Sequence, residues 1–334
     1  MADRPGRRGS WRKNPGEAGF LHDHVLAELE MGNAVSDAGA RAAHCTFVVV
    51  GAGYAGAETA AAMQAFTQHA LCRLINLRPE YLRWILADVA GHVLPELGPQ
   101  LSSAALRTLH QRRIEVRLQT SVEEVRAGSV RFSDGQTVGC RTLVWTAGVR
   151  ASPLMTTLGL DTGRAGRLVV TPDLQAPQRP DVFAAGDAAA VPDLTGAEAA
   201  ITAPTAQHAQ RQGIALAGNI VRSLRDEPAL PYRHHDLGLV VDLGGVRSVA
   251  RPLGYDLRGL PAQVITRGYH LNALPTMRAR GKAAANWLTH ALLGEDFVRV
   301  GLGDTSSLCL DDTIGYLSAD DTPAAAAELK DTTL

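Results

Sequence analysis

Hydrophobic and polar positions between residues 45 and 146 follow a strand-then-helix order. Cys45–Val50 ends in three consecutive valines, as a central strand of a parallel sheet does, and the alanine-rich Glu58–His69 predicts the helix after it. The other expected elements are a strand at Arg83–Asp88, a helix at Leu101–Arg112, and strands at Ile114–Leu118, Val122–Arg126, Ser129–Phe132 and Thr142–Thr146. This order predicts an α/β nucleotide-binding domain.

Weaker patterns flank this region. They predict helices at Phe20–Glu30, Ala203–Leu224 and Arg278–Leu293, short strands at Leu168–Val170 and Val182–Ala184, and a hairpin of Leu237–Leu243 with Val246–Ala250. We therefore expect a disordered tail at 1–20, a helix and linker at 21–44, a nucleotide domain at 45–146 and a second region at 147–232. A small α+β C-terminal region at 233–317 and a tail at 318–334 complete the chain.

Composition narrows the function classes. The 334 residues carry a net charge of about −1, so nothing in the overall charge favours nucleic acid. The four cysteines form no CxxC pair, which indicates a reduced cytoplasmic protein without a redox-active disulfide, and no metal site is expected. The most apolar stretch, Phe47–Phe66, contains Glu58, Gln64 and three glycines, so it predicts a strand, turn and helix rather than a bilayer span.

A glycine fingerprint follows the first strand. In Gly51-Ala-Gly53-Tyr-Ala-Gly56, the first glycine permits a tight turn and the second lets the backbone approach a pyrophosphate. The third allows helix and strand to pack closely, and the helix N-terminus offers N–H groups to the phosphates. The apolar strand before the motif and the helix after it favour dinucleotide binding.

Two acids complete this motif. Asp88 ends the next strand and is expected to accept hydrogen bonds from the ribose hydroxyls, which favours NADH over NADPH; a surface carboxylate is the alternative. Glu58 is expected on the first helical turn. It either complements the helix dipole or contacts the nicotinamide ribose or amide.

Four segments together resemble type II NADH:quinone dehydrogenases, within the FAD-dependent pyridine nucleotide oxidoreductases. They are Val48–Glu58, Thr142–Val149, Asp181–Asp187 and Ala203–Gly213. The resemblance implies a two-dinucleotide-binding, glutathione-reductase-like flavoprotein fold. By this resemblance, the nucleotide domain at 45–146 would bind NADH and the region at 147–232 would be the remaining part of an FAD domain.

The resemblance also implies site residues. Gly186 and Asp187 match the positions that meet the ribityl chain of FAD, although Asp187 could instead cap a helix starting at Ala188. Ala147 and Gly148 are expected at the cofactor. Ala206 and Gln207 begin a helix expected beside the flavin and the electron acceptor, and Glu58 and Gln207 are the catalytic candidates. The last glutamine of the family's quinone pattern is replaced by Arg211.

No Gly-x-Gly-x-x-Gly precedes Gly51, whereas the family begins with such a motif for FAD. We therefore expect a chain that lacks the N-terminal half of its FAD domain. One reading is an NADH dehydrogenase that passes hydride to flavin and electrons to a quinone or another acceptor. The alternative is a catalytically impaired NADH-binding remnant, or a partner of a separate chain that supplies the FAD loop.

The helix at Arg278–Leu293 has a modest apolar face, with Trp287, Leu288 and Leu292 beside basic residues. In the quinone reductases this position faces the membrane. The alternatives are therefore packing on the domain, a homodimer contact, or peripheral attachment at the inner face of the membrane.

Overall fold

The computed structural model describes residues 15–196, 200–235, 237–293 and 297–299. Two compact units share these residues. The first contains the chain up to Ala147 and again from Gly238, and the second is Gly148–Leu237. The expected tail at 318–334 lies outside the described residues.

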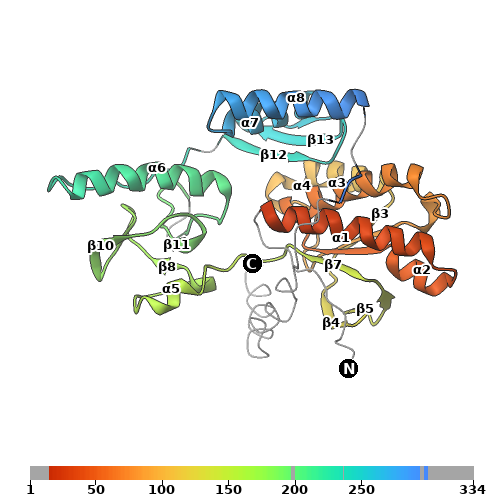
Figure 1. The fold of residues 1–334 in the computed structure, drawn as a ribbon. Helices are drawn as coiled ribbons and strands as arrows, with labels where there is room; N and C mark the ends of the chain where they lie inside the picture. Colours follow the sequence, from red (N-terminus) through yellow and green to blue (C-terminus); the bar gives the residue numbers. More distant parts are fainter. Residues whose placement is uncertain (1–14, 197–199, 236, 294–296, 300–334) are drawn as a thin grey trace. The chain divides into compact units, whose positions relative to one another are not determined.

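A four-stranded parallel sheet forms the centre of the first unit (Figure 1). Its order is β3 (Ile114–Arg117), β2 (Arg83–Ala87), β1 (Thr46–Val50) and β7 (Thr142–Trp145). Val48 lies opposite Ile85 on one side and Leu143 on the other, so β1 is the interior strand that its valines predicted. The predicted α/β class with a parallel sheet is confirmed.

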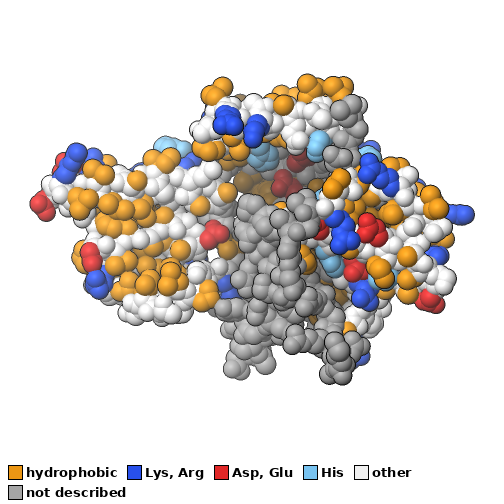
Figure 2. Space-filling model, in the orientation of Figure 1, with side chains coloured by type: hydrophobic (Ala, Val, Ile, Leu, Met, Phe, Trp, Pro, Cys, Tyr) orange, Lys and Arg blue, Asp and Glu red, His pale blue; other side chains and the backbone are white. Residues whose placement is uncertain are grey.

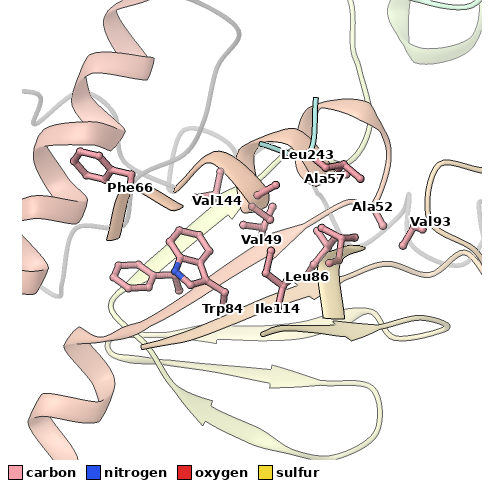
Figure 3. Close-up of a cluster of buried hydrophobic side chains, with 14 of the residues drawn as sticks. Val49, Ala52, Ala57, Phe66, Trp84, Leu86, Val93, Ile114, Val144 and Leu243 are labelled. Carbon is pink, nitrogen blue, oxygen red and sulfur yellow. The ribbon is translucent and has the colours of Figure 1, made fainter. Parts of the chain in front are cut away.

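Side chains of β1 alternate between two hydrophobic cores. Phe47 and Val49 face a core shared with the helices, whereas Val48 and Val50 face the antiparallel meander. Trp84 of β2 stacks on Phe47 with ring centroids 4.6 Å apart, and its Nε1 donates to the Thr67 hydroxyl at 3.1 Å. Figure 3 shows Trp84 beside the strand residues of the first core.

Helices cover one face of this sheet and a meander covers the other (Figure 1). The helices are α1 (Pro15–Ala34), α2 (Ala38–His44), α3 (Tyr54–Ala70) and α4 (Gly98–Gln111), and the meander is β4 (Val122–Arg126), β5 (Ser129–Phe132) and β6 (Thr137–Gly139). Short 3-10 turns occur at Leu71–Arg73, Pro79–Tyr81 and Pro95–Leu97. Helix α1 begins at Pro15, so residues 15–20, expected in the disordered tail, are helical instead.

The C-terminal segment completes the first unit. Its elements are β12 (Gly238–Asp242), β13 (Ser248–Pro252), β14 (Leu257–Arg258), α7 (Leu260–Ala273) and α8 (Met277–Leu293). Val241, Leu243 and Val249 belong to the same core as the helices of the nucleotide domain. The β12–β13 hairpin follows the predicted pattern, whereas α7 was not predicted; Pro261, two residues after Gly259, was its start signal.

The second unit has a smaller core around Leu168, Leu174 and Val191. Its elements are α5 (Leu154–Thr157), a 3-10 turn at Arg164–Gly166, β8 (Leu168–Val169), β9 (Gln175–Ala176), β10 (Arg179–Phe183), a 3-10 turn η5 (Gly186–Ala188), β11 (Ala189–Ala190) and α6 (Ala206–Ser223). Strands β8 and β11 pair in parallel, and β9 and β10 pair antiparallel. Among the described residues, no helix combines the length and apolarity needed to cross a bilayer.

Candidate nucleotide-binding site

The turn after β1 brings the three fingerprint glycines together. Gly51 has φ +107°, a conformation that glycine adopts without strain, and its N–H donates to the Ala87 carbonyl at 2.8 Å. Gly53 precedes the first residue of α3, and no side chain caps the helix there. The first N–H groups of α3 therefore have no side-chain cap.

Gly56 is the position at which helix, turn and strand meet. A Cβ there would collide with the Gly51 carbonyl oxygen and would lie 2.6 Å from the Thr146 hydroxyl oxygen. That hydroxyl donates to the Val50 carbonyl at 2.7 Å, which ties the end of β7 to the turn. By contrast, a Cβ on Gly53 would meet no atom within 4 Å. The turn is thus tightly packed inside and open outside, as a backbone cradle for a pyrophosphate requires.

Asp88 lies directly beyond β2 and contacts this turn. Its Oδ2 accepts a hydrogen bond from the Ala52 N–H, and its Oδ1 accepts one from the Ala90 N–H at 2.8 Å. The two carboxylate oxygens have acceptor capacity for further donors. The acid therefore braces the glycine turn as well as standing at the position expected for a ribose contact.

Glu58 lies deeper in its helix than the sequence predicted. Helix α3 begins at Tyr54, so Glu58 is beyond the first turn. Its Oε1 accepts a hydrogen bond from the Asp242 N–H of β12 at 2.8 Å. Burial raises the pKa of Glu58 to about 7, against the opposing effect of that hydrogen bond. A proton can therefore be bound or released here near neutral pH.

Asp242 links Glu58 to α7 and was not identified from the sequence. Its carboxylate accepts hydrogen bonds from the Gly244 N–H at 2.8 Å and from Gln263 Nε2 at 3.1 Å. Gln263 is buried and also accepts from the Ser248 hydroxyl. Because 184 positions separate Glu58 from Asp242, no local motif could have signalled the pair.

The second unit holds the other predicted cofactor residues. Gly186 is buried with φ +65°, and its N–H donates to Gln212 Oε1 at 2.7 Å. Asp187 follows within the short η5 turn, which leads into β11. The alternative role of Asp187 as the cap of a helix beginning at Ala188 is therefore wrong. Ala147 ends the first unit and Gly148, with φ +76°, begins the second.

A buried arginine lies near this acid. Arg167 is 9% exposed and donates from one terminal nitrogen to the Thr202 carbonyl at 3.0 Å. Burial lowers the pKa of Arg167, and Asp187 opposes that effect. Within the described part of the chain, Arg167 Nε is buried and has no hydrogen-bond partner. The Nε–H of Arg167 can therefore donate to an acceptor that the described protein atoms do not supply.

Helix α6 begins at Ala206 rather than at Ala203 as the pattern predicted, so Gln207 lies in its first turn. The Thr205 hydroxyl caps the helix by accepting from the His208 N–H at 3.3 Å. Gln212 is fully buried and donates to the Thr202 hydroxyl at 3.0 Å, so it is directed into the unit. Arg211, which occupies the position of the family's last glutamine, donates to the His235 carbonyl.

His208 is buried on the same helix. Its Nδ1 lies 3.1 Å from the Tyr232 hydroxyl, and its ring centroid lies 4.1 Å from that of His234. Burial lowers the pKa of His208, and the neighbouring His234 adds to this effect. The imidazole is therefore favoured in its neutral form and held within a packed cluster.

Comparison with known proteins gives a consistent result. The family model described as pyridine nucleotide-disulphide oxidoreductase matches residues 8–213. The type II NADH:quinone oxidoreductase NdhA of Mycobacterium tuberculosis is 31% identical over 283 residues, which cover 80% of this chain and 58% of the relative. The demethylphylloquinone reductase NdbB of Synechocystis is 32% identical, with 73% and 58% covered. The resemblance drawn from the four sequence segments is confirmed.

Solved structures show the same fold. The structure of NDH2 from Plasmodium falciparum in complex with NADH superposes with a TM-score of 0.79 at 14% identity, covering 89% of this chain and 75% of that one. The flavoprotein fold class predicted from the sequence is therefore confirmed. The chain spans 58% of the length of the two curated relatives described above.

Proposed function

Because the chain belongs to the pyridine nucleotide-disulphide oxidoreductase family, we propose that it is an FAD-dependent NADH dehydrogenase that delivers electrons to a quinone or another small acceptor. The observation that carries this proposal is the packed glycine turn, which Asp88 braces and from which α3 leads to Glu58. Names of the relatives support the same reading, since one reduces quinone with NADH and another reduces demethylphylloquinone.

Residues of the first unit would bind NADH. The backbone at Gly51, Gly53 and Gly56 would hold the pyrophosphate against the N-terminus of α3. The free acceptor capacity of Asp88 would hold a ribose hydroxyl and would repel a 2′-phosphate. Glu58, with a pKa of about 7, would contact the nicotinamide end and hold a proton there.

Residues of the second unit fit an FAD molecule. Gly186 adopts a left-handed backbone conformation and has no side chain, and Asp187 follows it directly. The buried Arg167 Nε has no acceptor among the described atoms. Ala206 and Gln207 would present the N-terminus of α6, whose first turn contains no acidic residue. Bound FAD would supply the two-electron chemistry between NADH and the acceptor. Ala147 and Gly148 would adjoin the cofactor.

The main test is direct. We expect the purified chain to show the visible absorption of bound flavin and to oxidise NADH in the presence of menadione or a soluble dye. Binding of NADH without flavin, even after reconstitution with FAD, would favour the alternative of a nucleotide-binding module or of a chain completed by a partner. Absence of both NADH and flavin binding would refute the proposal.

Replacing Asp88 with alanine is expected to weaken NADH binding by about tenfold. The change removes the ribose acceptor and leaves the Ala52 N–H of the turn without its partner. The measurement is a fluorescence titration of the purified variant with NADH, alongside thermal unfolding.

Asp134→Ala is the matched control, because Asp134 also accepts from a backbone N–H, that of Gln136 at 2.9 Å, but lies in an exposed turn of the meander. We expect this variant to bind NADH as the unmodified chain does. Equal affinities for Asp88→Ala and Asp134→Ala would remove Asp88 from the proposed site.

A peripheral membrane contact through the α7–α8 hairpin is part of the same proposal. Figure 2 shows hydrophobic and basic side chains over these helices. Val264, Met277, Leu288 and Leu292 are exposed there, and Arg267 packs over the Trp287 ring at 4.8 Å. Sedimentation with anionic vesicles tests this contact, and a homodimer formed through the same surface would appear instead as a doubled mass in solution.

A further inference from the structure

A pocket in the first unit is lined by three arginines and by none of the glycine-turn residues. Its volume is about 230 Å³, and its walls come from α4, the β12–β13 turn, β13, β14 and Gly259, the residue before α7. Arg107, Arg247 and Arg258 contribute the charges, one from each of three separate elements. No acidic residue is among the lining residues.

The positive charge of this pocket is weakly compensated by its surroundings. Among the described residues, no ion pair within 4.0 Å is formed by Arg107, Arg247 or Arg258. Asp256 influences Arg258 electrostatically, but its carboxylate is engaged by Arg251 at 2.6 Å. The pocket therefore concentrates several cationic groups with little protein counter-charge.

A fourth arginine adds to this concentration. Arg112 follows α4 and lines a different pocket, which shares Gln111 with this one. Burial lowers the pKa of Arg112, and repulsion from Arg247 adds to this effect, while Asp242 opposes it. Arg112 Nε is buried and has no hydrogen-bond partner within the described residues. An anion bound at Arg247 would offset the repulsion that Arg247 exerts on Arg112.

The backbone beside the pocket also contributes partial positive charge. Gly259 lines the pocket and immediately precedes α7, a 14-residue helix without an acidic residue in its first turn and without a side-chain cap. The positive end of that helix dipole therefore adds to the field of the arginines. This contribution is secondary to the three side-chain charges.

We propose that this pocket binds a phosphate-bearing anion through Arg107, Arg247 and Arg258. A phosphate group has several acceptor oxygens in a tetrahedral arrangement, so it can bridge guanidinium groups that approach from three elements. A planar carboxylate has two oxygens and matches such a three-sided set less well. The volume suits a single phosphate or a phosphate headgroup rather than a complete dinucleotide. None of the lining residues is among the proposed NADH and FAD residues.

The test uses the full chain and inorganic phosphate as the probe. Thermal unfolding is followed while sodium phosphate replaces sodium chloride at constant ionic strength, with and without saturating NADH. We expect phosphate to raise the melting temperature in both series. The double variant Arg247→Gln with Arg258→Gln should require at least about tenfold more phosphate for the same shift.

Arg126→Gln serves as the matched control, because Arg126 is an exposed arginine that pairs with Glu124 on the meander. It should respond to phosphate as the unmodified chain does. If the double variant and this control respond equally, the phosphate binds elsewhere, for example at the glycine turn, and the proposal is overturned. Circular dichroism without phosphate establishes that both variants are folded.

Vesicles distinguish the two sources of a phosphate group. Vesicles that contain phosphatidic acid and vesicles of phosphatidylcholine alone are incubated with the chain and with the double variant. Binding to the anionic vesicles that free phosphate displaces, and that the double variant loses, identifies a lipid headgroup. A thermal response to phosphate without such vesicle binding identifies a soluble phosphorylated ligand. No response to either probe refutes the site.

Discussion

Replacing Gly56 with alanine is expected to abolish most NADH binding and to destabilise the first unit. The added Cβ would collide with the Gly51 carbonyl and approach the Thr146 hydroxyl oxygen to 2.6 Å, so the turn must move away from α3. Such overpacking costs about 3 kcal/mol of unfolding free energy. A turn displaced in this way no longer presents its backbone to a pyrophosphate, and we expect NADH affinity to fall by about a hundredfold.

Alanine substitutions at two other glycines distinguish steric crowding from a general effect of replacing glycine with alanine. Gly53→Ala adds a Cβ in open space, so the fold should keep its stability while a bound pyrophosphate would meet the new methyl group. Gly218→Ala lies in the exposed part of α6 with no atom within 4 Å of the new Cβ. It should stabilise the protein by about 1 kcal/mol.

Urea unfolding and NADH titration of the three variants give the comparison. The expected order of stability places Gly218→Ala highest and Gly56→Ala lowest. Gly56→Ala with unchanged stability and unchanged NADH affinity would contradict the packed turn as the basis of binding.

Replacing Glu58 with glutamine is expected to flatten the pH dependence of stability between about pH 4.5 and 7. Burial raises the pKa of Glu58 from 4.5 to about 7 in the folded state. The folded protein therefore holds the proton more tightly than the unfolded chain does. The resulting stabilisation is fully present below pH 4.5 and is lost as pH rises to about 7.

The size of this effect follows from the linkage between pKa and stability. One pKa unit corresponds to about 1.4 kcal/mol, so Glu58 accounts for up to about 3 kcal/mol across this range. Glutamine is neutral at every pH and nearly the same shape, so it removes the effect without emptying the site. Above pH 7 the variant should be more stable than the unmodified chain.

Urea unfolding at intervals from pH 4.5 to 8 provides the measurement. Glu124→Gln is the control, because Glu124 is an exposed carboxylate whose pKa is lowered by its hydrogen bond to Arg126. The Glu124→Gln variant should still lose the stability that Glu58 contributes as pH rises from 4.5 to about 7. Parallel curves for Glu58→Gln and the unmodified chain would show that Glu58 carries no raised pKa.

Local patterns were sufficient for most elements of the nucleotide domain, although the short strand β6 (Thr137–Gly139) was not predicted. The valine run of β1, the glycines after it and the acid after β2 lie within short stretches, where strand propensity, turn geometry and the buried apolar pattern agree. The Gly186–Asp187 segment was recognisable from its resemblance to the family rather than from local propensity. Helix α7 was missed because its apolar positions are irregular and its start depends on Pro261 after Gly259.

Tertiary structure alone decided how distant segments complete the site. The hydrogen bond from Asp242 to Glu58, the shared core of Val241 and Leu243 with the helices, and the three-arginine pocket all join residues far apart in the chain. Propensity and spacing act over a few residues, whereas burial and the pKa of Glu58 depend on which surfaces finally pack together. The sequence therefore identified the types of the site residues, but the burial and the pKa of their side chains are determined only by the tertiary packing.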